Sequence, residues 1–327
     1  MKKNMKKIIA LALAVIMITA VLAGCDKKSG SGGVKTYKVG VSIYKFDDNF
    51  MTLYRKEIES YFKTLETDTV KYDLTIMDGK GDMVEQTNQV DGFIAQKVDV
   101  MIINLVQSSS ANTITEKAKS AGIPVVYINR EPSEADMKAW DKICYVGADA
   151  RQSGTYQGEI IRDLPNHGDA DGDGVIRYVM IMGDPENVDA QYRTEFSIKA
   201  LTDAGYEVEN LFQQRGDWEQ SKGQELAANA LAQFGDKIDV ILCNNDGMAM
   251  GAIQAIKSAN RTVGEDIYLV GVDAIPEAVD AIKAGDMTGT VLNDHIGQSH
   301  TAVDAAVKYV NNQSVDTYLW INYQKVQ

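Results

Sequence analysis

Apolar strands alternate with amphipathic helices from Tyr37 onward, and this alternation restricts the fold more than any other feature. The segments Tyr37–Tyr44, Tyr72–Met77 and Val100–Val106 are rich in Val, Ile, Tyr and Met, as buried strands are. Between the first two of them, Phe50–Leu65 has the period of an amphipathic helix. Strands and helices that alternate in this way form a parallel, doubly wound sheet.

The same pattern returns in the second half of the chain and predicts a second lobe. Strands are expected at Val175–Met182, Val240–Cys243 and Thr290–Leu292, with amphipathic helices between them. Few Gly or Pro residues lie where the chain would pass between the halves, so we expect hinge strands there. The predicted fold class is α/β, with two doubly wound parallel-sheet lobes joined by hinge strands.

The N-terminus has the features of a secretion signal. Four lysines precede an apolar run from Ile8 to Leu22, which is shorter than the ~20 residues of a membrane-spanning helix. The run ends in Leu22-Ala23-Gly24-Cys25, which resembles a bacterial lipobox, and Cys25 would then be the lipidated first residue of the mature protein. We predict a signal peptide over 1–24, a flexible tether over 25–36, and a lipid anchor at the extracytoplasmic face of the cell membrane.

Charge and cysteine content restrict the class of protein further. The formal net charge of the 327 residues is −13, and without the four lysines of residues 1–24 it is −17. An acidic surface of this kind argues against nucleic acid as a partner. Cys144 and Cys243 each lie in an apolar strand. We expect two buried free thiols, with a disulfide between them as the alternative.

Polar residues follow the predicted strands at their carboxyl ends. Any single one is typical of a helix cap or a turn. Five such clusters in one chain indicate a shared cleft, because open α/β sheets bind ligands at this edge. Amides and carboxylates suit a neutral ligand that is rich in hydroxyl groups. The candidate residues in these clusters are Asp48, Asn104, Asn245, Asp273 and Asn293.

Four further residues extend this candidate cleft. Asp189 and Arg193 are spaced i, i+4 at the start of a predicted helix. They form either a simple helix ion pair or a polar pair that faces a ligand. Phe50 and Trp218 follow polar turns, where an aromatic ring could stack on the apolar C–H face of a pyranose. The alternative for each ring is a core or capping position of its helix.

Three aspartates at alternate positions, Asp169, Asp171 and Asp173, precede the strand that begins at Val175. With glycines between them they form the first half of an EF-hand-like calcium loop, in which Val175 supplies a backbone carbonyl. Met180 stands at the twelfth position, where an acidic ligand is usual. A calcium ion would therefore need its last carboxylate from elsewhere in the chain, and a solvated Asp-Gly turn is the alternative.

Several long motifs resemble those of the periplasmic galactose/glucose-binding proteins, the sugar receptors of ABC transporters. The resemblance runs from about Tyr37 to about Val326 and is carried by motifs such as GVSIYKFDDNFM (Gly40–Met51), GDPENVDAQYRT (Gly183–Thr194) and CNNDGMAMGA (Cys243–Ala252). It implies a type I periplasmic binding protein-like fold. One lobe would comprise 37–123 with 294–327 and the other 124–293, and the two would close on a sugar.

The resemblance also implies a role for each candidate. Asp48 and Asn104 would bind sugar hydroxyls from the first lobe, while Phe50 stacks on the ring. Trp218 would cover the opposite face of the sugar, and Asn293 would complete the set near a hinge. The remaining residues that would hydrogen-bond the sugar are Asn187, Asp189, Arg193, Asn245 and Asp273.

The chain departs from the family pattern in three places. Asn187 stands where the family usually has His, which leaves the epimer preference open. In the calcium loop, Arg177 replaces the ninth ligand and Asp239 replaces the closing Glu. A loop without metal, in which Arg177 folds back onto the aspartates, is therefore an alternative. The chain stops at Gln327, before the family's third hinge crossing and terminal strand, so we expect an unpaired sheet edge.

The predicted function is an extracytoplasmic receptor for D-galactose/D-glucose that serves the permease subunits of an ABC transporter, with no catalytic residues. A receptor for another monosaccharide and a chemotaxis receptor of the same fold are the alternatives. A glycosidase is less favoured, because each candidate acid lies among amides or beside Arg193. A DNA-binding sugar sensor would need a helix-turn-helix where this chain has its signal peptide.

Overall fold

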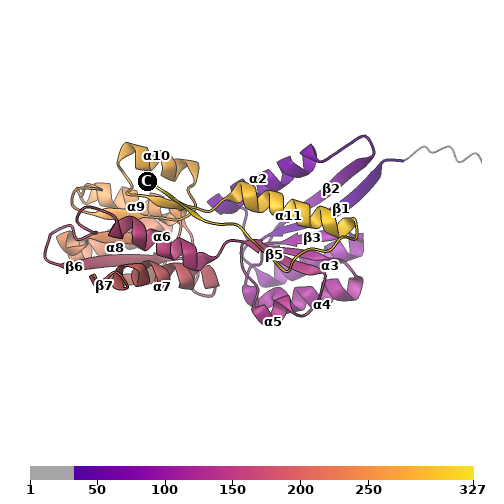
Figure 1. Ribbon diagram of the computed structural model, residues 1–327, viewed down its shortest axis with the longest axis horizontal. Coiled ribbons are helices and arrows are strands. Elements are labelled where there is room, and N and C mark those ends of the chain that lie inside the picture. The colour runs from indigo at the N-terminus through magenta and orange to yellow at the C-terminus, as the bar shows by residue number, and fades with distance from the viewer. Residues whose placement is uncertain (1–32) are drawn as a thin grey trace, which may run out of the picture. The chain divides into compact units, whose positions relative to one another are not determined.

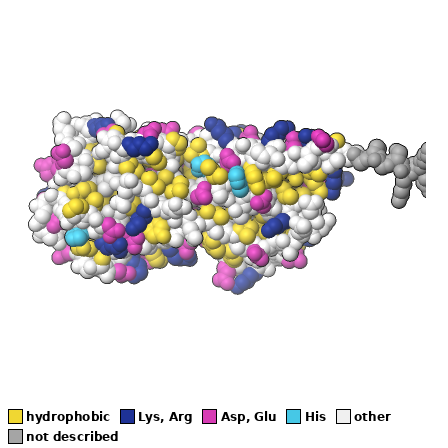
Figure 2. All heavy atoms as spheres, turned by 45° about the horizontal axis from the view of Figure 1, so that its top comes forward, with side chains coloured by type: hydrophobic (Ala, Val, Ile, Leu, Met, Phe, Trp, Pro, Cys, Tyr) yellow, Lys and Arg dark blue, Asp and Glu magenta, His cyan; other side chains and the backbone are white. Residues whose placement is uncertain are grey.

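The structure, a computed structural model, describes residues 33–327, of which Thr36–Gln327 form one compact unit. The predicted signal peptide, Cys25 and the tether up to residue 32 lie outside the described residues. The first strand begins at Lys35, inside the segment predicted as tether. Within residues 33–327, no helix combines the length and apolar character needed to cross a bilayer. On the face drawn in Figure 2, acidic, basic and apolar side chains are interspersed.

The first lobe is built on a six-stranded sheet in the order β11-β5-β4-β3-β1-β2 (Figure 1). The pairs β1–β3, β3–β4, β4–β5 and β5–β11 are parallel. Helices α2 and α11 pack on one face, and α3, α4 and α5 on the other. The strands are β1 Lys35–Ile43, β2 Val70–Asp78, β3 Val100–Ile103, β4 Val125–Ile128, β5 Ile143–Gly147 and β11 Tyr318–Trp320; the helices are α2 Asn49–Thr64, α3 Met83–Gln96, η1 Ser108–Ser110, α4 Ala111–Ala121, α5 Glu134–Met137 and α11 His295–Val310.

The second lobe contains a parallel sheet in the order β7-β6-β8-β9 and an antiparallel pair, β10–β12. Single bridges join Val270 to Gly289 and Asp273 to Leu292, so the pair extends the main sheet. Helices α6 and α7 pack on one face, and α8, α9 and α10 on the other. The strands are β6 Val175–Met182, β7 Glu207–Arg215, β8 Val240–Cys243, β9 Tyr268–Val270, β10 Thr290–Leu292 and β12 Gln324–Val326; the helices are α6 Ala150–Arg162, α7 Val188–Thr202, α8 Gln220–Phe234, η2 Gly235–Lys237, α9 Asp246–Ser258 and α10 Pro276–Ala284. The predicted class, two parallel α/β lobes, is confirmed.

The lobe boundary predicted between residues 123 and 124 is wrong. β4 pairs with β3 through Met101 and Val125, and β5 pairs with β4 through Val125 and Ile143. Residues up to Gly147 therefore belong to the first sheet, and the chain crosses to the second lobe between Gly147 and Ala150. The apolar sequence of β4 suits a central position in either sheet, so its composition does not reveal the neighbours it pairs with.

The expectation of an unpaired edge at the C-terminus is also wrong. After β11 the chain crosses once more, over residues 321–323, and ends in β12. In this strand Lys325 pairs with Val291 of β10. The third crossing and the terminal strand are both present, and they cover the edge of β10. A strand of three residues, Gln324–Val326, is too short to show a period in the sequence.

Two glycines on α6 set the position of α7, the helix that carries Asp189 and Arg193. A Cβ atom at Gly154 would lie 2.8 Å from the carbonyl oxygen of Tyr192, and one at Gly158 would lie 2.2 Å from that of Ser197. Both distances are shorter than real contacts of a Cβ atom. Any other residue at these positions would push α6 and α7 apart and displace the polar side chains of α7.

Cys144 and Cys243, the two cysteines of the described residues, are free and buried, as predicted. Cys144 lies in β5 of the first lobe and Cys243 in β8 of the second. Burial raises the pKa of the Cys144 thiol to about 12 and that of Cys243 well above its usual range. Neither side chain is therefore a reactive thiolate at neutral pH.

Candidate ligand-binding site

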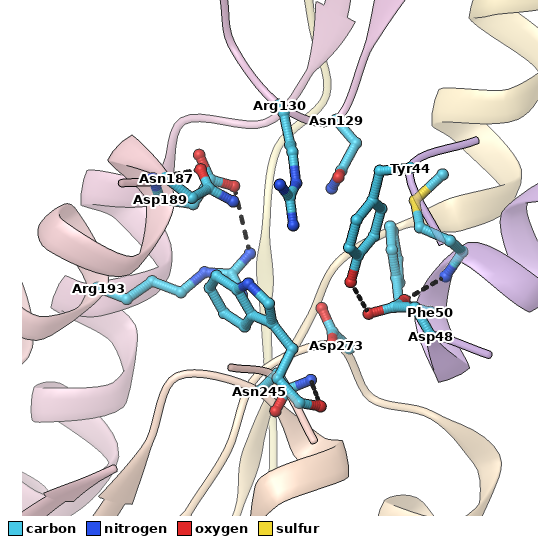
Figure 3. Close-up of a pocket in the computed structure, with 12 residues that line it drawn as sticks. Tyr44, Asp48, Phe50, Asn129, Arg130, Asn187, Asp189, Arg193, Asn245 and Asp273 are labelled. Atoms are coloured by element: carbon cyan, nitrogen blue, oxygen red, sulfur yellow. Dashed lines mark hydrogen bonds and ion pairs between the residues drawn. The ribbon is translucent and has the colours of Figure 1, made fainter. Parts of the chain in front are cut away.

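A polar pocket lies between the two lobes, and six residues from each lobe line it (Figure 3). It encloses about 330 Å³, part of which is open to solvent. The structure brings together eight of the ten residues that the sequence assigned to sugar binding. They are Asp48, Phe50, Asn187, Asp189, Arg193, Trp218, Asn245 and Asp273.

The first lobe presents an oriented carboxylate beside an aromatic ring. Asp48 is the N-cap residue of α2, and its Oδ1 accepts a hydrogen bond from the backbone N–H of Met51 at 2.7 Å. Its Oδ2 accepts one from the Tyr44 hydroxyl at 2.6 Å. Each carboxylate oxygen has a further lone pair for a ligand. Phe50 lies in the first turn of α2 and packs edge-to-face on Tyr54, with ring centroids 5.9 Å apart.

Four further lining residues were not assigned from the sequence, namely Tyr44, Met51, Asn129 and Arg130. Asn129 and Arg130 follow β4, and Tyr44 follows β1. The Arg130 guanidinium lies 3.8 Å from the centroid of the Tyr44 ring and donates a hydrogen bond to the Val106 carbonyl. Asn129 has φ +62°, a conformation that costs energy and is concentrated at functional sites. The signal in the sequence was the position of Asn129 and Arg130 directly after a strand.

Two predicted sugar contacts are not lining residues of this pocket. Asn104 is fully buried, and its amide donates to the Ile128 carbonyl at 3.2 Å and to the Asn129 side chain at 3.1 Å. Asn293 donates to Asp273 at 3.2 Å. Both amides thus hold a lining residue in place. Direct contact of Asn104 and Asn293 with a ligand stays a prediction.

Arg193 is fixed by contacts from two distant parts of the chain. Nη1 donates to the Asn244 carbonyl at 2.7 Å, and Nη2 donates to the Tyr323 hydroxyl at 3.1 Å. Asp189 is 3.6 Å from Nη2, which is an ion pair longer than a hydrogen bond. The buried Nε of Arg193 has no partner among the described residues, so it is a donor available to a ligand. Tyr323 lies just before β12 and was also missed from the sequence.

Trp218 and Asp273 enter the pocket on strained backbone. Trp218 has φ +69° and Asp273 has φ +123°, as expected where a site imposes the conformation. The Trp218 ring packs on Gly183, where a Cβ atom would lie 2.2 Å from the ring. The buried Nε1 of Trp218 has no partner within residues 33–327. Asn245, the N-cap residue of α9, donates to the Trp218 carbonyl at 3.3 Å and so steadies this loop.

The charges of the pocket are close to balance in a buried environment. Burial raises the pKa of Asp189 to about 6, although Arg193 and Arg130 act in the opposite direction. Burial likewise raises the pKa of Asp273, opposed by Arg193. Asp48 contributes a third carboxylate. Three acids facing two guanidinium groups suit a neutral ligand that both donates and accepts hydrogen bonds.

The predicted calcium loop has only part of the expected ligand geometry. Asp169, Asp171 and Asp239 bring ligand atoms within 4.8 Å of one another. Asp173 is instead paired with Arg177 at 2.8 Å. The carboxylate oxygens of Asp239 accept backbone N–H groups of Ala170 at 3.0 Å and Arg177 at 2.7 Å.

Arg177 supplies a positive charge in this loop. Its guanidinium also approaches Asp171 at 3.8 Å and Glu209 at 3.0 Å. Calcium takes six to eight oxygen ligands. The N–H of Val175 donates to the Asp173 carboxylate at 3.0 Å, a hydrogen bond that closes the turn. The arrangement favours the alternative in which arginine closes the loop. Calcium binding at Asp169, Asp171, Asp173, Val175 and Asp239 stays a prediction.

Comparison with known proteins places the chain in a class. Residues 39–314 match the family model described as "Periplasmic binding protein domain". The chain therefore belongs to the periplasmic binding protein family, whose relatives here are binding proteins of sugar transporters and not enzymes. The family predicted from the sequence motifs is confirmed.

Individual relatives narrow the comparison. The chain is 36% identical to the D-galactose/methyl-galactoside binding periplasmic protein MglB of Haemophilus influenzae, over 85% of this chain and 82% of that protein. It is 35% identical to the putative rhizopine-binding protein of Rhizobium meliloti, over 98% of this chain and 96% of that protein. A solved ABC transporter solute binding protein from Bacillus halodurans, with bound myo-inositol, has a TM-score of 0.78 and 29% identity, over 91% of this chain and 96% of that one.

Proposed function

We propose that this chain is the extracytoplasmic receptor of a sugar ABC transporter and binds D-galactose or D-glucose between its lobes. The observation that carries the proposal is one pocket in which both lobes supply hydrogen-bonding groups and aromatic rings, among them Phe50 and Trp218. A pyranose has hydroxyl groups around its edge and apolar C–H faces. The pocket offers partners for both, and the similarity to a galactose-binding relative supports this choice.

Sugar binding would complete hydrogen bonds that the protein leaves open. The Nε of Arg193 and the Nε1 of Trp218 are buried donors without partners in the described chain, and sugar oxygens would accept from them. Sugar hydroxyls would donate to Asp48 and Asp189. Because the partners come from both lobes, the sugar favours the closed arrangement, and exclusion of water strengthens each bond.

A cyclitol such as myo-inositol is the second candidate. It is also a six-membered ring bordered by hydroxyl groups, but it has no ring oxygen. One observation favours it: a solved structure with a TM-score of 0.78 and 29% identity to this chain holds myo-inositol. Asn187, which stands in the pocket where the galactose/glucose-binding family usually has His, leaves room for this difference in specificity.

A thermal-shift panel tests the proposal and separates the two candidates. The mature domain is heated with D-galactose, D-glucose, myo-inositol or D-ribose. At a ligand concentration of 100 Kd, binding to the folded state adds about 2.7 kcal/mol to the free energy of unfolding. We expect this stabilisation with galactose or glucose. A rise in Tm with myo-inositol alone would favour the cyclitol, and no rise with any of the four ligands by a folded protein would contradict the proposal.

The receptor would be held at the membrane through Cys25 and would deliver its ligand to permease subunits of the transporter. The lipobox-like segment supports the membrane anchor, and the family supports delivery to the permease. Fractionation of cells tests the anchor: the wild-type protein should sediment with membranes, and Cys25→Ser should appear in the soluble extracytoplasmic fraction. An equal distribution of the two would contradict lipidation. A chemoreceptor partner stays a prediction that a pull-down would test.

A further inference from the structure

A second groove adjoins the candidate sugar pocket and also lies between the lobes. It encloses about 1130 Å³, much of it open to solvent. Val188 lies between two lining residues of the sugar pocket along the chain, and Glu131 follows a third. The groove therefore shares a wall with that pocket. Its lining residues are Ser108, Glu131, Pro132, Ser133, Glu134, Tyr318 and Trp320 from the first lobe and Arg151, Val188 and Tyr192 from the second.

Aromatic side chains form two walls of this groove. Tyr318 and Trp320 of β11 are stacked, with ring centroids 5.6 Å apart and an interplanar angle of 3°. Trp320 is 43% exposed, which is unusual for a large apolar side chain in the described chain. Tyr192 lies on the second lobe, and the guanidinium of Arg151 sits 4.2 Å from the centroid of its ring. One aromatic ring of the groove already carries a cation on its face, whereas the rings of Tyr318 and Trp320 carry none in the described residues.

Glu131 is an acid of the groove that no cation of the described chain binds directly. Its carboxylate has no hydrogen bond or ion pair within residues 33–327, whereas Glu134 pairs with Lys138 at 2.5 Å and Arg151 pairs with Asp149 at 2.9 Å. Burial, and then the nearby Asp189, raise the pKa of Glu131 to about 7. The carboxylate also acts on Tyr318, whose pKa is raised by burial and by Glu131. Arg151 opposes the rise in the pKa of Glu131, but no cation of the described residues pairs directly with this half-buried acid beside the aromatic faces.

We propose that this groove binds a small organic cation with an apolar shell, such as a quaternary ammonium compound. Glu131 is the counter-ion, and the Tyr318–Trp320 stack is the face on which the cation rests. A metal ion or a hydrated ammonium ion would not match, because the walls offer rings where those ions need oxygen ligands. Residues of both lobes line the groove, so the cation favours the closed arrangement. The proposal does not depend on which sugar the adjacent pocket takes.

Calorimetric titration of the mature protein with choline tests this site, without added sugar and with the neutral isostere 3,3-dimethylbutan-1-ol as control. We expect saturable binding of choline and none of the isostere. Glu131→Gln removes the charge at constant shape and should weaken choline binding at least tenfold. Trp320→Leu should do the same, while Trp320→Phe keeps an aromatic face and should retain binding. Circular dichroism and Tm establish that each variant is folded.

Three outcomes would overturn the proposal. The first is the absence of choline binding by the folded wild-type protein, and the second is equal binding of the neutral isostere. The third is binding that survives Glu131→Gln and Trp320→Leu but is lost in Trp218→Ala, which would place the cation in the sugar pocket. A failed sugar titration leaves all three readouts intact, so the two proposals are tested separately.

Discussion

Three residues of the sugar pocket also cap helices. Asp48, Asn187 and Asn245 are the N-cap residues of α2, α7 and α9, and each side chain accepts a backbone N–H of its own helix. The cap fixes the side-chain rotamer before a ligand arrives, so little side-chain entropy is lost on binding. Capping and ligand binding therefore depend on the same atoms, and substitutions can separate the two contributions.

Asp48 allows this separation most cleanly. Asp48→Asn keeps an oxygen for the cap but loses a charged acceptor, so the Tm should change little while sugar affinity falls about ten- to a hundredfold. Asp48→Ala removes both and should also lower the free energy of unfolding by about 1 kcal/mol. Calorimetry and thermal denaturation measure the two effects. Equal affinity of Asp48→Asn and wild type would exclude Asp48 as a ligand residue.

Asp189 makes sugar binding depend on pH. Its pKa of about 6 lies above its usual value of 3.8 because the carboxyl is buried. The ionised form accepts more hydrogen bonds, so sugar affinity should fall as pH decreases through about 6. The free energy of unfolding depends on pH in the opposite sense. The stabilisation that comes from the raised pKa of Asp189 is complete below pH 3.8 and is lost as the pH rises through 6. Affinity measured from pH 5 to 8 tests this, and a flat profile equal to that of Asp189→Asn would contradict it.

Most lining residues were predictable from the sequence because Asp and Asn follow strands in a regular way. The direction in which each side chain points was not predictable. Asn104 and Asn293 occupy equivalent positions, yet they turn toward Asn129 and Asp273. Tyr323 was missed for another reason: its contact with Arg193 joins residues 130 positions apart, and no local pattern reports a contact of that range.

At the scale of elements, the loop ahead of β6 shows how one residue changes a motif. Asp169 accepts backbone N–H groups of Gly172 at 2.8 Å and Gly174 at 2.9 Å, so the loop is closed by its own amides. Arg177 points back to Asp173 and adds a positive charge. Because the positive charge of Arg177 is part of the chain, it is present in the loop whether or not calcium is available.

This arrangement predicts that a chelator leaves the Tm of the wild-type protein unchanged. Arg177→Gln removes the positive charge and frees Asp171 and Asp173, so its Tm should fall and should recover when calcium is added. Lys283→Gln, which removes an equally local surface pair with Asp280, is the control. A chelator-dependent fall in the Tm of the wild type would instead establish the calcium loop first expected from the aspartate spacing.

Elements differed in how clearly the sequence marked them. The apolar strands β1, β3, β6 and β8 were predicted, because burial on both faces leaves a continuous apolar run. β7 was not, since Glu207–Arg215 lies at a sheet edge and is largely polar and exposed. α6 was missed as well: it packs through Gly154 and Gly158 on α7, and glycine lowers the helical signal that the apolar period would give.

At the scale of the whole described unit, side chains at the cleft rim join the lobes directly. Lys45 of the first lobe pairs with Glu219 of the second at 3.1 Å. Gln107 of the first lobe donates to Glu186 of the second at 2.6 Å. These contacts lie outside the sugar pocket and exist only when the lobes are close. They should slow opening, and hence ligand release, without changing which ligand is chosen.

Lys45→Ala should therefore increase the dissociation rate of the sugar, measured by stopped-flow fluorescence. A partly exposed ion pair contributes about 0.2–1 kcal/mol, so we expect at most about a fivefold effect. The difference from wild type should disappear in 1 M salt, which screens such pairs. Lys138→Ala breaks a pair within the first lobe and should leave the rate unchanged. A rate for Lys45→Ala equal to that of wild type at low salt would contradict the role of the rim.

The most direct test of the central claim is calorimetric titration of the mature wild-type protein with D-galactose, D-glucose and myo-inositol. The account predicts one binding site per chain for at least one of these ligands. It also predicts that affinity falls at least tenfold both in Asp48→Asn of the first lobe and in Trp218→Ala of the second, with Trp140→Phe, outside the pocket, as control. Absence of heat with all three ligands, or affinity that is unchanged by both substitutions in folded variants, would contradict a ligand held between the two lobes.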